Sequence, residues 1–151
     1  MLITIEPYKQ KITAELMALL LMADPNKHAI SAYLPNAAIL VAKNQTTLAG
    51  VAVLTHEHST FELKNIAVKE THQGKGIAKT LISHTKHLAK QMGATLIEVG
   101  TGNSSLDQLA LYQKCGFRLH RIKPDYFSSY PTPIYEKGIR CRDLVILRAS
   151  L

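Results

Sequence analysis

Apolar residues alternate with polar ones in some stretches of the chain and recur with helical spacing in others. The alternating or short continuous apolar stretches predict strands at 2–6, 37–43, 48–56, 60–68, 94–99, 117–122 and 142–149. The helical spacing predicts helices at 9–23, 24–35, 77–92 and 106–115. This order predicts an α/β fold: a mixed, mostly antiparallel sheet of about seven strands, flanked by about four helices.

Length and composition favour one domain over residues 1–151, with no repeat or linker. Two cysteines, Cys115 and Cys141, neither build a disulfide framework nor match a zinc-site spacing, so a reducing compartment is expected. The longest apolar stretch, Ile12 to Ala23, is too short to cross a bilayer. The first residues do not resemble a signal peptide. Together these features predict a cytoplasmic protein without a membrane partner.

The net charge of +7 indicates either a soluble, mildly basic surface or an anionic partner such as nucleic acid, a membrane or a phosphorylated cofactor, and the basic residues form no long run. This spread argues against a nucleic-acid-binding arm. Histidines occur in pairs at 56 and 58 and at 84 and 87, without a third ligand at a metal-site spacing. We therefore predict surface histidines and no metal site.

The segment "HQGKGIAKTL" (72–81) allows two interpretations. Its glycines can simply permit a turn before an amphipathic helix. Alternatively, Gly74 and Gly76 expose backbone N–H groups at a helix N-terminus, where an anion binds. The segment matches neither the Walker motif nor the dinucleotide fingerprint. The lysines of this helix lie off its apolar stripe, which consists of Ile77, Ala78, Leu81, Ile82, Leu88, Ala89 and Met92.

Two motifs lie in the right order around this helix. The first is Gln73, Gly76 and Ala78; the second is Asn103, Ala110, Leu111-Tyr112 and Gly116-Phe117. With them the chain resembles the GNAT superfamily of acetyl-CoA-dependent N-acetyltransferases over about residues 48–120, and the order of elements extends the likeness to the whole chain. The resemblance implies an α+β type GNAT fold and acetyl transfer to a primary amine of a small molecule or peptide, by direct attack.

The resemblance also implies roles for individual residues. Tyr112 becomes the general acid and Glu62 the general base. The pyrophosphate lies on the backbone of the 73–79 segment, and the pantetheine arm pairs with 66–68, where one N–H group stabilises the oxyanion. The implied cofactor-binding residues are Ile66, Ala67, Val68, Gln73, Gly74, Lys75, Gly76, Ile77, Ala78, Lys79, Asn103 and Tyr112.

Each role has a structural alternative. Tyr112 points about 150° away from the polar side of its helix, which also suits a core tyrosine. Glu62 can be a solvated strand carboxylate, with water chains serving as the base. Asn103 can shape its loop instead of binding pantetheine, and Ser104 with Asp107 predicts a capping box.

The aromatic segment 125–138 contains Asp125 and Glu136, and it can border the acceptor site, form a homodimer interface or pack under a surface loop. The alternative function is a non-catalytic acyl-CoA-binding module on the same fold.

Overall fold

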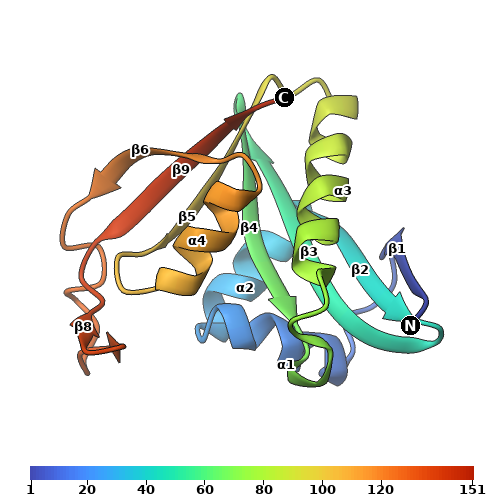
Figure 1. Cartoon of the computed structure of the whole chain (residues 1–151), viewed down its shortest axis with the longest axis horizontal. Helices are drawn as coiled ribbons and strands as arrows, with labels where there is room; N and C mark the ends of the chain where they lie inside the picture. The colour runs from blue at the N-terminus through green and yellow to red at the C-terminus, as the bar shows by residue number, and fades with distance from the viewer.

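The computed structural model describes all 151 residues and contains one seven-stranded sheet in the order β1-β2-β3-β4-β5-β9-β6 (Figure 1). The strands are β1 (Ile3–Pro7), β2 (Ala38–Asn44), β3 (Thr47–Glu57), β4 (Thr60–Val68), β5 (Leu96–Gly102), β6 (Arg118–Lys123) and β9 (Leu144–Ser150). A separate hairpin pairs β7 (Tyr135–Glu136) with β8 (Ile139–Arg140). The helices are α1 (Ala14–Ala23), α2 (Lys27–Tyr33), α3 (Ile77–Gln91) and α4 (Leu106–Lys114), with 3-10 turns η1 (Leu34–Asn36) and η2 (Glu70–His72). The predicted mixed, mostly antiparallel sheet is confirmed, since β4–β5 is its single parallel pair.

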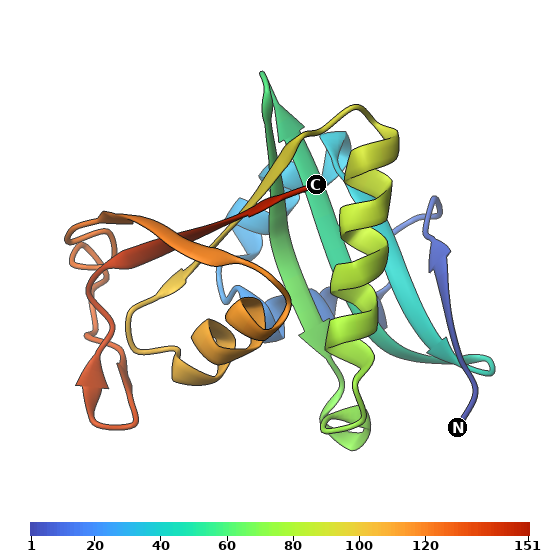
Figure 2. The same ribbon diagram turned by 45° about the horizontal axis from the view of Figure 1, so that its top comes forward.

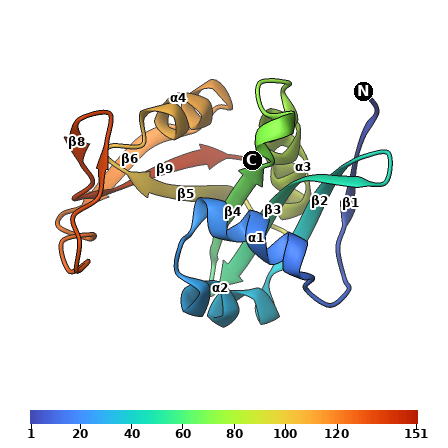
Figure 3. The same ribbon diagram turned by 90° about the horizontal axis from the view of Figure 1, so that it is seen from below.

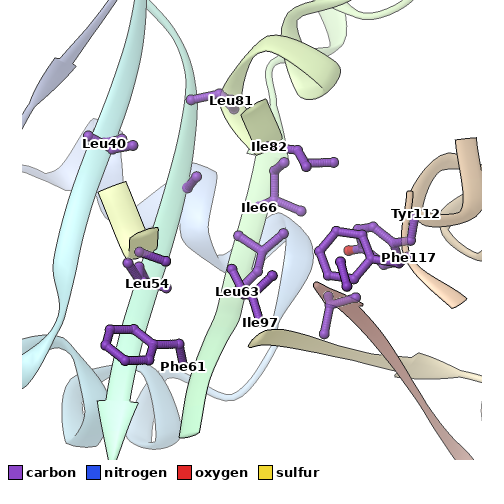
Figure 4. Packing of buried hydrophobic residues seen from close by; sticks show 14 of the residues in the cluster. Leu40, Leu54, Phe61, Leu63, Ile66, Leu81, Ile82, Ile97, Tyr112 and Phe117 are labelled. Carbon is purple, nitrogen blue, oxygen red and sulfur yellow. The ribbon is translucent and has the colours of Figure 1, made fainter. Parts of the chain in front are cut away.

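The helices cover both faces of the sheet, with α1 and α2 on one face and α3 and α4 on the other (Figure 3). The α3 and α4 face holds the larger core, in which Leu81, Tyr112 and Phe117 pack against apolar strand residues (Figure 4). The α1 and α2 face holds a smaller core around Leu16 and Leu20. Strand β4 contributes to both cores, so its two faces are fixed by burial on each side.

The first two helices begin later than the apolar spacing predicts, because side-chain caps set their starts. Thr13 accepts a hydrogen bond from the Leu16 N–H at 3.1 Å, so α1 begins at Ala14 rather than at residue 9. Asn26 accepts from the Ala29 N–H at 3.1 Å, so α2 begins at Lys27, after Asp24 and Pro25. No helix combines the length and apolar character that a bilayer crossing needs.

Two predicted details of the later chain are wrong. Met92 is 48% exposed instead of buried, because it is the C-cap of α3, and Thr85 fills the buried stripe. The Thr85 hydroxyl donates to the Leu81 carbonyl at 2.8 Å, which satisfies it inside the core. The expected loop before the last strand contains the β7–β8 hairpin, whose turn has positive φ at Lys137 and Gly138.

Candidate active site

Strands β4 and β5 diverge shortly after they pair. They are joined only at 62–63 and 98–99. Just beyond, the register with β3 shifts because Lys64 is an extra residue on β4. Such a bulge bends the strand that carries it. The two strands therefore run apart (Figure 2), and residues 64–68 of β4 keep an edge without a strand partner.

A cavity of about 300 Å³ lies in this opening. Its walls come from β4, β5 and α4, with Met22 and Ala23 from the end of α1 and Glu136 from β7. Tyr112 faces it from α4 and Asn65 from the bent part of β4. The opening thus combines an unpaired strand edge with a polar pocket, an arrangement that an extended amide-containing ligand can fill.

The 74–79 segment forms the predicted cradle of backbone N–H groups. Gly74 and Gly76 have φ of +75° and +82°, backbone conformations that residues with a side chain rarely adopt. A Cβ atom added at either glycine would have no atom within 4 Å outside the neighbouring residues. No protein carbonyl or side chain accepts from the six N–H groups between Gly74 and Lys79. The helix dipole adds positive potential there. One segment thus combines an amphipathic helix start with free backbone N–H groups that open space surrounds.

The side chains of the cradle have different surroundings. Ile77 is buried and anchors the start of α3, whereas Lys75 and Lys79 are exposed. The Gln73 amide donates to the Val68 carbonyl at 2.9 Å, which ties the cradle to the end of β4. The backbone N–H groups of the segment are therefore accessible, and the two lysines add positive charge at its edge.

Tyr112 points into the protein, as its helical position predicts. It is 4% exposed, and its ring packs edge-on against Phe117 with 5.9 Å between ring centroids (Figure 4). Burial raises the pKa of the Tyr112 hydroxyl to about 12, and the nearby Cys115 thiol adds to the shift. The hydroxyl therefore stays protonated at neutral pH.

Glu62 lies on the opposite face of the sheet from Tyr112 and is half-buried. It lines a second cavity of about 380 Å³ that shares Lys64, Val99 and Gly100 with the first. The Lys64 ammonium is 3.7 Å from the Glu62 carboxylate, too far for a hydrogen bond. Glu62 is therefore an accessible carboxylate beside the point where the strands diverge.

The Asn103 side chain is used within its own loop. Its amide donates to the Arg140 carbonyl at 3.0 Å, and its oxygen accepts from the N–H groups of Arg142 and Asp143 at 2.8 and 2.9 Å. Three bonds to one segment favour the loop-shaping alternative for Asn103.

The predicted capping box at the start of α4 is wrong. Ser105 is the N-cap and no side chain caps the helix. The Ser104 hydroxyl donates to Glu136 at 2.7 Å, and Asp107 accepts from Lys137 at 2.9 Å. The β7–β8 hairpin, which the sequence pattern did not reveal, brings both of these partners to α4.

Three candidate functional residues, Asn65, Tyr33 and Glu98, were not identified from the sequence patterns. Asn65 donates to the Leu20 carbonyl and the Tyr33 hydroxyl, each at 3.0 Å, and so ties β4 to α1 and α2. Burial raises the pKa of Tyr33. Glu98 is 8% exposed and accepts two hydrogen bonds from Arg148. A polar residue inside an otherwise apolar strand, in "LKNIAV" and "TLIEVG", is the signal that could have found Asn65 and Glu98.

Within the aromatic segment 125–138, one side chain lines a cavity and others pack against each other. Tyr126 lines the 380 Å³ cavity, while Phe127 packs edge-on against Tyr126 and Tyr130. Asp125 bonds within its own turn, accepting from Ser128.

The family model for the GNAT acetyltransferases matches residues 9–117, which include the cradle, Glu62 and Tyr112. The chain belongs to the GNAT acetyltransferase family. It is 48% identical to the N-acetyltransferase YvbK of Bacillus subtilis over 139 residues, 91% of this chain and 90% of that one. This GNAT chain is therefore an acyltransferase, not a binding module without activity.

Solved structures of similar proteins support the cofactor. A Bacillus subtilis acetyltransferase in complex with CoA has a TM-score of 0.94 and 46% identity, covering 99% of both chains. An Elizabethkingia anophelis GNAT acetyltransferase with acetyl-CoA bound has a TM-score of 0.92 and 41% identity, covering 99% of this chain and 98% of that one. This GNAT enzyme uses acetyl-CoA as its co-substrate.

Proposed function

We propose that this GNAT enzyme transfers the acetyl group of acetyl-CoA directly to a primary amine of a small molecule or peptide. One observation carries the proposal: a protonated Tyr112 and an accessible Glu62 flank the same opening from opposite faces of the sheet. Cys115, the competing nucleophile, lines neither cavity and packs against the larger core. The amine therefore attacks acetyl-CoA directly, and the acetyl group is not first transferred to Cys115.

The chain offers fitting partners along the whole co-substrate. The free N–H groups of 74–79 suit the pyrophosphate, with Lys75 and Lys79 adding charge outside it. The unpaired edge of 64–68, which includes Ile66, Ala67 and Val68, suits the amides of the pantetheine arm. Acetyl-CoA supplies an activated thioester at the end of this path. A backbone N–H of β4 is the proposed donor to its carbonyl oxygen.

The proton transfers of the reaction give Glu62 the role of base and Tyr112 the role of acid. An aliphatic amine has a pKa near 10.4 and arrives protonated, so Glu62 accepts a proton from it, either directly or through water. The neutral nitrogen then attacks the acetyl carbon, the C–S bond breaks, and the Tyr112 hydroxyl gives its proton to the departing sulfur. A tyrosine with its pKa near 12 still donates this proton at neutral pH because the hydroxyl is present in the protonated form. The second proton that the nitrogen loses as it becomes an amide leaves through water and restores the Tyr112 hydroxyl, while Glu62 releases its proton to solvent.

The test is a panel of primary amines with acetyl-CoA, followed by release of free thiol. Tyr112→Phe should lower kcat by about 10²- to 10⁴-fold with little change in the Kd of acetyl-CoA, because a general acid acts in the transition state. Glu62→Gln should remove the acid limb of the pH–rate profile. An unchanged kcat would exclude Tyr112 as the acid, and an unchanged acid limb would exclude Glu62 as the base.

We also infer that residues 1–151 act as one domain, because β1 and β9 from both ends of the chain join one sheet. The cytoplasmic location and the homodimer stay predictions from the sequence. Size-exclusion chromatography coupled to light scattering tests the second.

A further inference from the structure

The 380 Å³ cavity contains charges of both signs. Glu62 and Glu98 lie on adjacent strands at its base, and Arg121 and Lys123 line it from β6. The two cations are two residues apart on one strand, so their side chains lie on the same face of the sheet. This cavity is on the acceptor side of the opening, away from the α3 cradle.

The buried Glu98 does not use up this positive charge. Arg148 donates to one Glu98 oxygen, Oε2, from Nε at 3.1 Å and from Nη2 at 2.7 Å, and its charge balances that of the carboxylate. The Arg121 guanidinium forms an ion pair with the other Glu98 oxygen at 3.6 Å but no hydrogen bond, and Lys123 forms no ion pair. Arg121 and Lys123 therefore keep donors free for a ligand.

The distance between Arg121 and Glu62 limits how long a ligand that contacts both can be. Although β6 is the edge strand, the Arg121 side chain reaches back over Glu98 on β5. Glu98 pairs directly with Glu62, and neighbouring strands lie about 4.8 Å apart. The Arg121 guanidinium is therefore about two strand spacings or less from the proposed base, which suits a short ligand.

We propose that the acceptor is a short primary amine that also carries an anionic group. Its amine lies at Glu62, and Arg121 and Lys123 bind its anion. This inference rests on the proposed function, since it assigns the substrate class of the same site. A second ammonium in place of the anion would lie beside Lys123, which has no ion-pair partner, and Arg121, which makes no hydrogen bond, so diamines are disfavoured at this end of the cavity.

Carboxylates and phosphates share the recognised chemistry, and the acceptor panel separates them. The panel contains 4-aminobutyrate, 2-aminoethyl phosphate, 1-aminobutane and 1,4-diaminobutane. The anionic amines should have a kcat/KM about tenfold or more above that of 1-aminobutane, because charge-assisted hydrogen bonds to the anion are strong. The better of the two anionic amines identifies the anion. The diamine should be the poorest acceptor.

Substitutions then test whether Arg121 and Lys123 cause the preference for anionic amines. Arg121→Gln and Lys123→Gln should each lower the ratio of kcat/KM between the anionic amine and 1-aminobutane by about tenfold. Arg118→Gln is the matched control, because Arg118 is exposed on the same strand but does not line this cavity. It should leave the ratio as in the wild type. Arg121→Glu should reverse the order of 4-aminobutyrate and 1,4-diaminobutane, and thermal unfolding checks that each variant is folded.

The outcomes separate the two proposals. If no amine in a broad panel releases CoA, the proposed function fails, and the anion site fails with it. If amines are acetylated but the wild-type ratio is one or lower, only the anion site is wrong. A wild-type preference that persists in both glutamine variants would also overturn the assignment of Arg121 and Lys123.

Discussion

Replacing Tyr112 by Phe tests the burial of its hydroxyl separately from catalysis. The side chain is 4% exposed, and the phenyl ring can keep its edge-on contact with Phe117. No protein group depends on the hydroxyl as a hydrogen-bond partner. The substitution should therefore change the free energy of unfolding by less than about 1 kcal/mol at pH 7.

At alkaline pH the two proteins should differ in stability. The pKa of Tyr112 is about 12 in the folded protein, against an ordinary value of 10.0 that applies when the chain is unfolded. Because the folded pKa is raised, the stability that the protonated hydroxyl contributes is present below pH 10 and is lost as the pH rises towards 12. The loss amounts to about 1.4 kcal/mol at pH 11 and approaches about 2.7 kcal/mol well above pH 12. Tyr112→Phe lacks this loss.

The assay is urea denaturation of both proteins at pH 7, 9, 10 and 11. Other groups that titrate in this range are common to the two proteins, so the difference between their free energies of unfolding isolates Tyr112. Tyr135→Phe is the matched control, because Tyr135 is 63% exposed and should give a curve parallel to the wild type. If the curve of Tyr112→Phe also runs parallel to the wild type up to pH 11, burial does not hold the proton on Tyr112. The proposed state of the acid would then be wrong.

Three further substitutions, the first with a matched control, test the cradle, the part-buried Glu98–Arg148 ion pair and the loop. Gly76→Ala should cost about 1 kcal/mol of stability through its positive φ and raise the KM of acetyl-CoA about tenfold, because its methyl group enters the space that the anion approaches. Gly93→Ala, with φ +95° beyond the opposite end of α3, should show the same strain and an unchanged KM. Arg148→Met should destabilise the fold by about 2 kcal/mol in urea denaturation, since Glu98 loses both hydrogen bonds. Asn103→Ala should cost about 1–3 kcal/mol, with little change in the KM of acetyl-CoA.

Each of these expectations has a contrary outcome. Equal effects of Gly76→Ala and Gly93→Ala on KM would show that the cradle does not hold the phosphates. A stability of Arg148→Met equal to that of the wild type would mean that Glu98 does not depend on its arginine. A large rise in KM with unchanged stability for Asn103→Ala would restore the pantetheine-binding role of Asn103.

Sequence periodicity was sufficient for the elements whose signals are local. The apolar stripe of α3 and the inward direction of Tyr112 follow from helical geometry alone. The cradle follows from two glycines before a helix. The predicted helix starts were less accurate where a single capping side chain decides them. Thr13 and Asn26 do so for α1 and α2. The pairing of Ser104 with Glu136 was unpredictable, because its partner lies 32 residues away in sequence.

The sequence by itself thus determined the order of the elements, the exposed backbone N–H groups before α3 and the tyrosine on α4, because each depends on residues within one or two turns of one another. Tertiary structure decided the opening itself, through the extra residue Lys64 that bends β4 away from β5. It also decided the 380 Å³ cavity, which Glu62 and Arg121 both line although β5 and β9 lie between their strands in the sheet. Pairing between distant strands is set by burial on both faces of the whole sheet, and no local pattern specifies it.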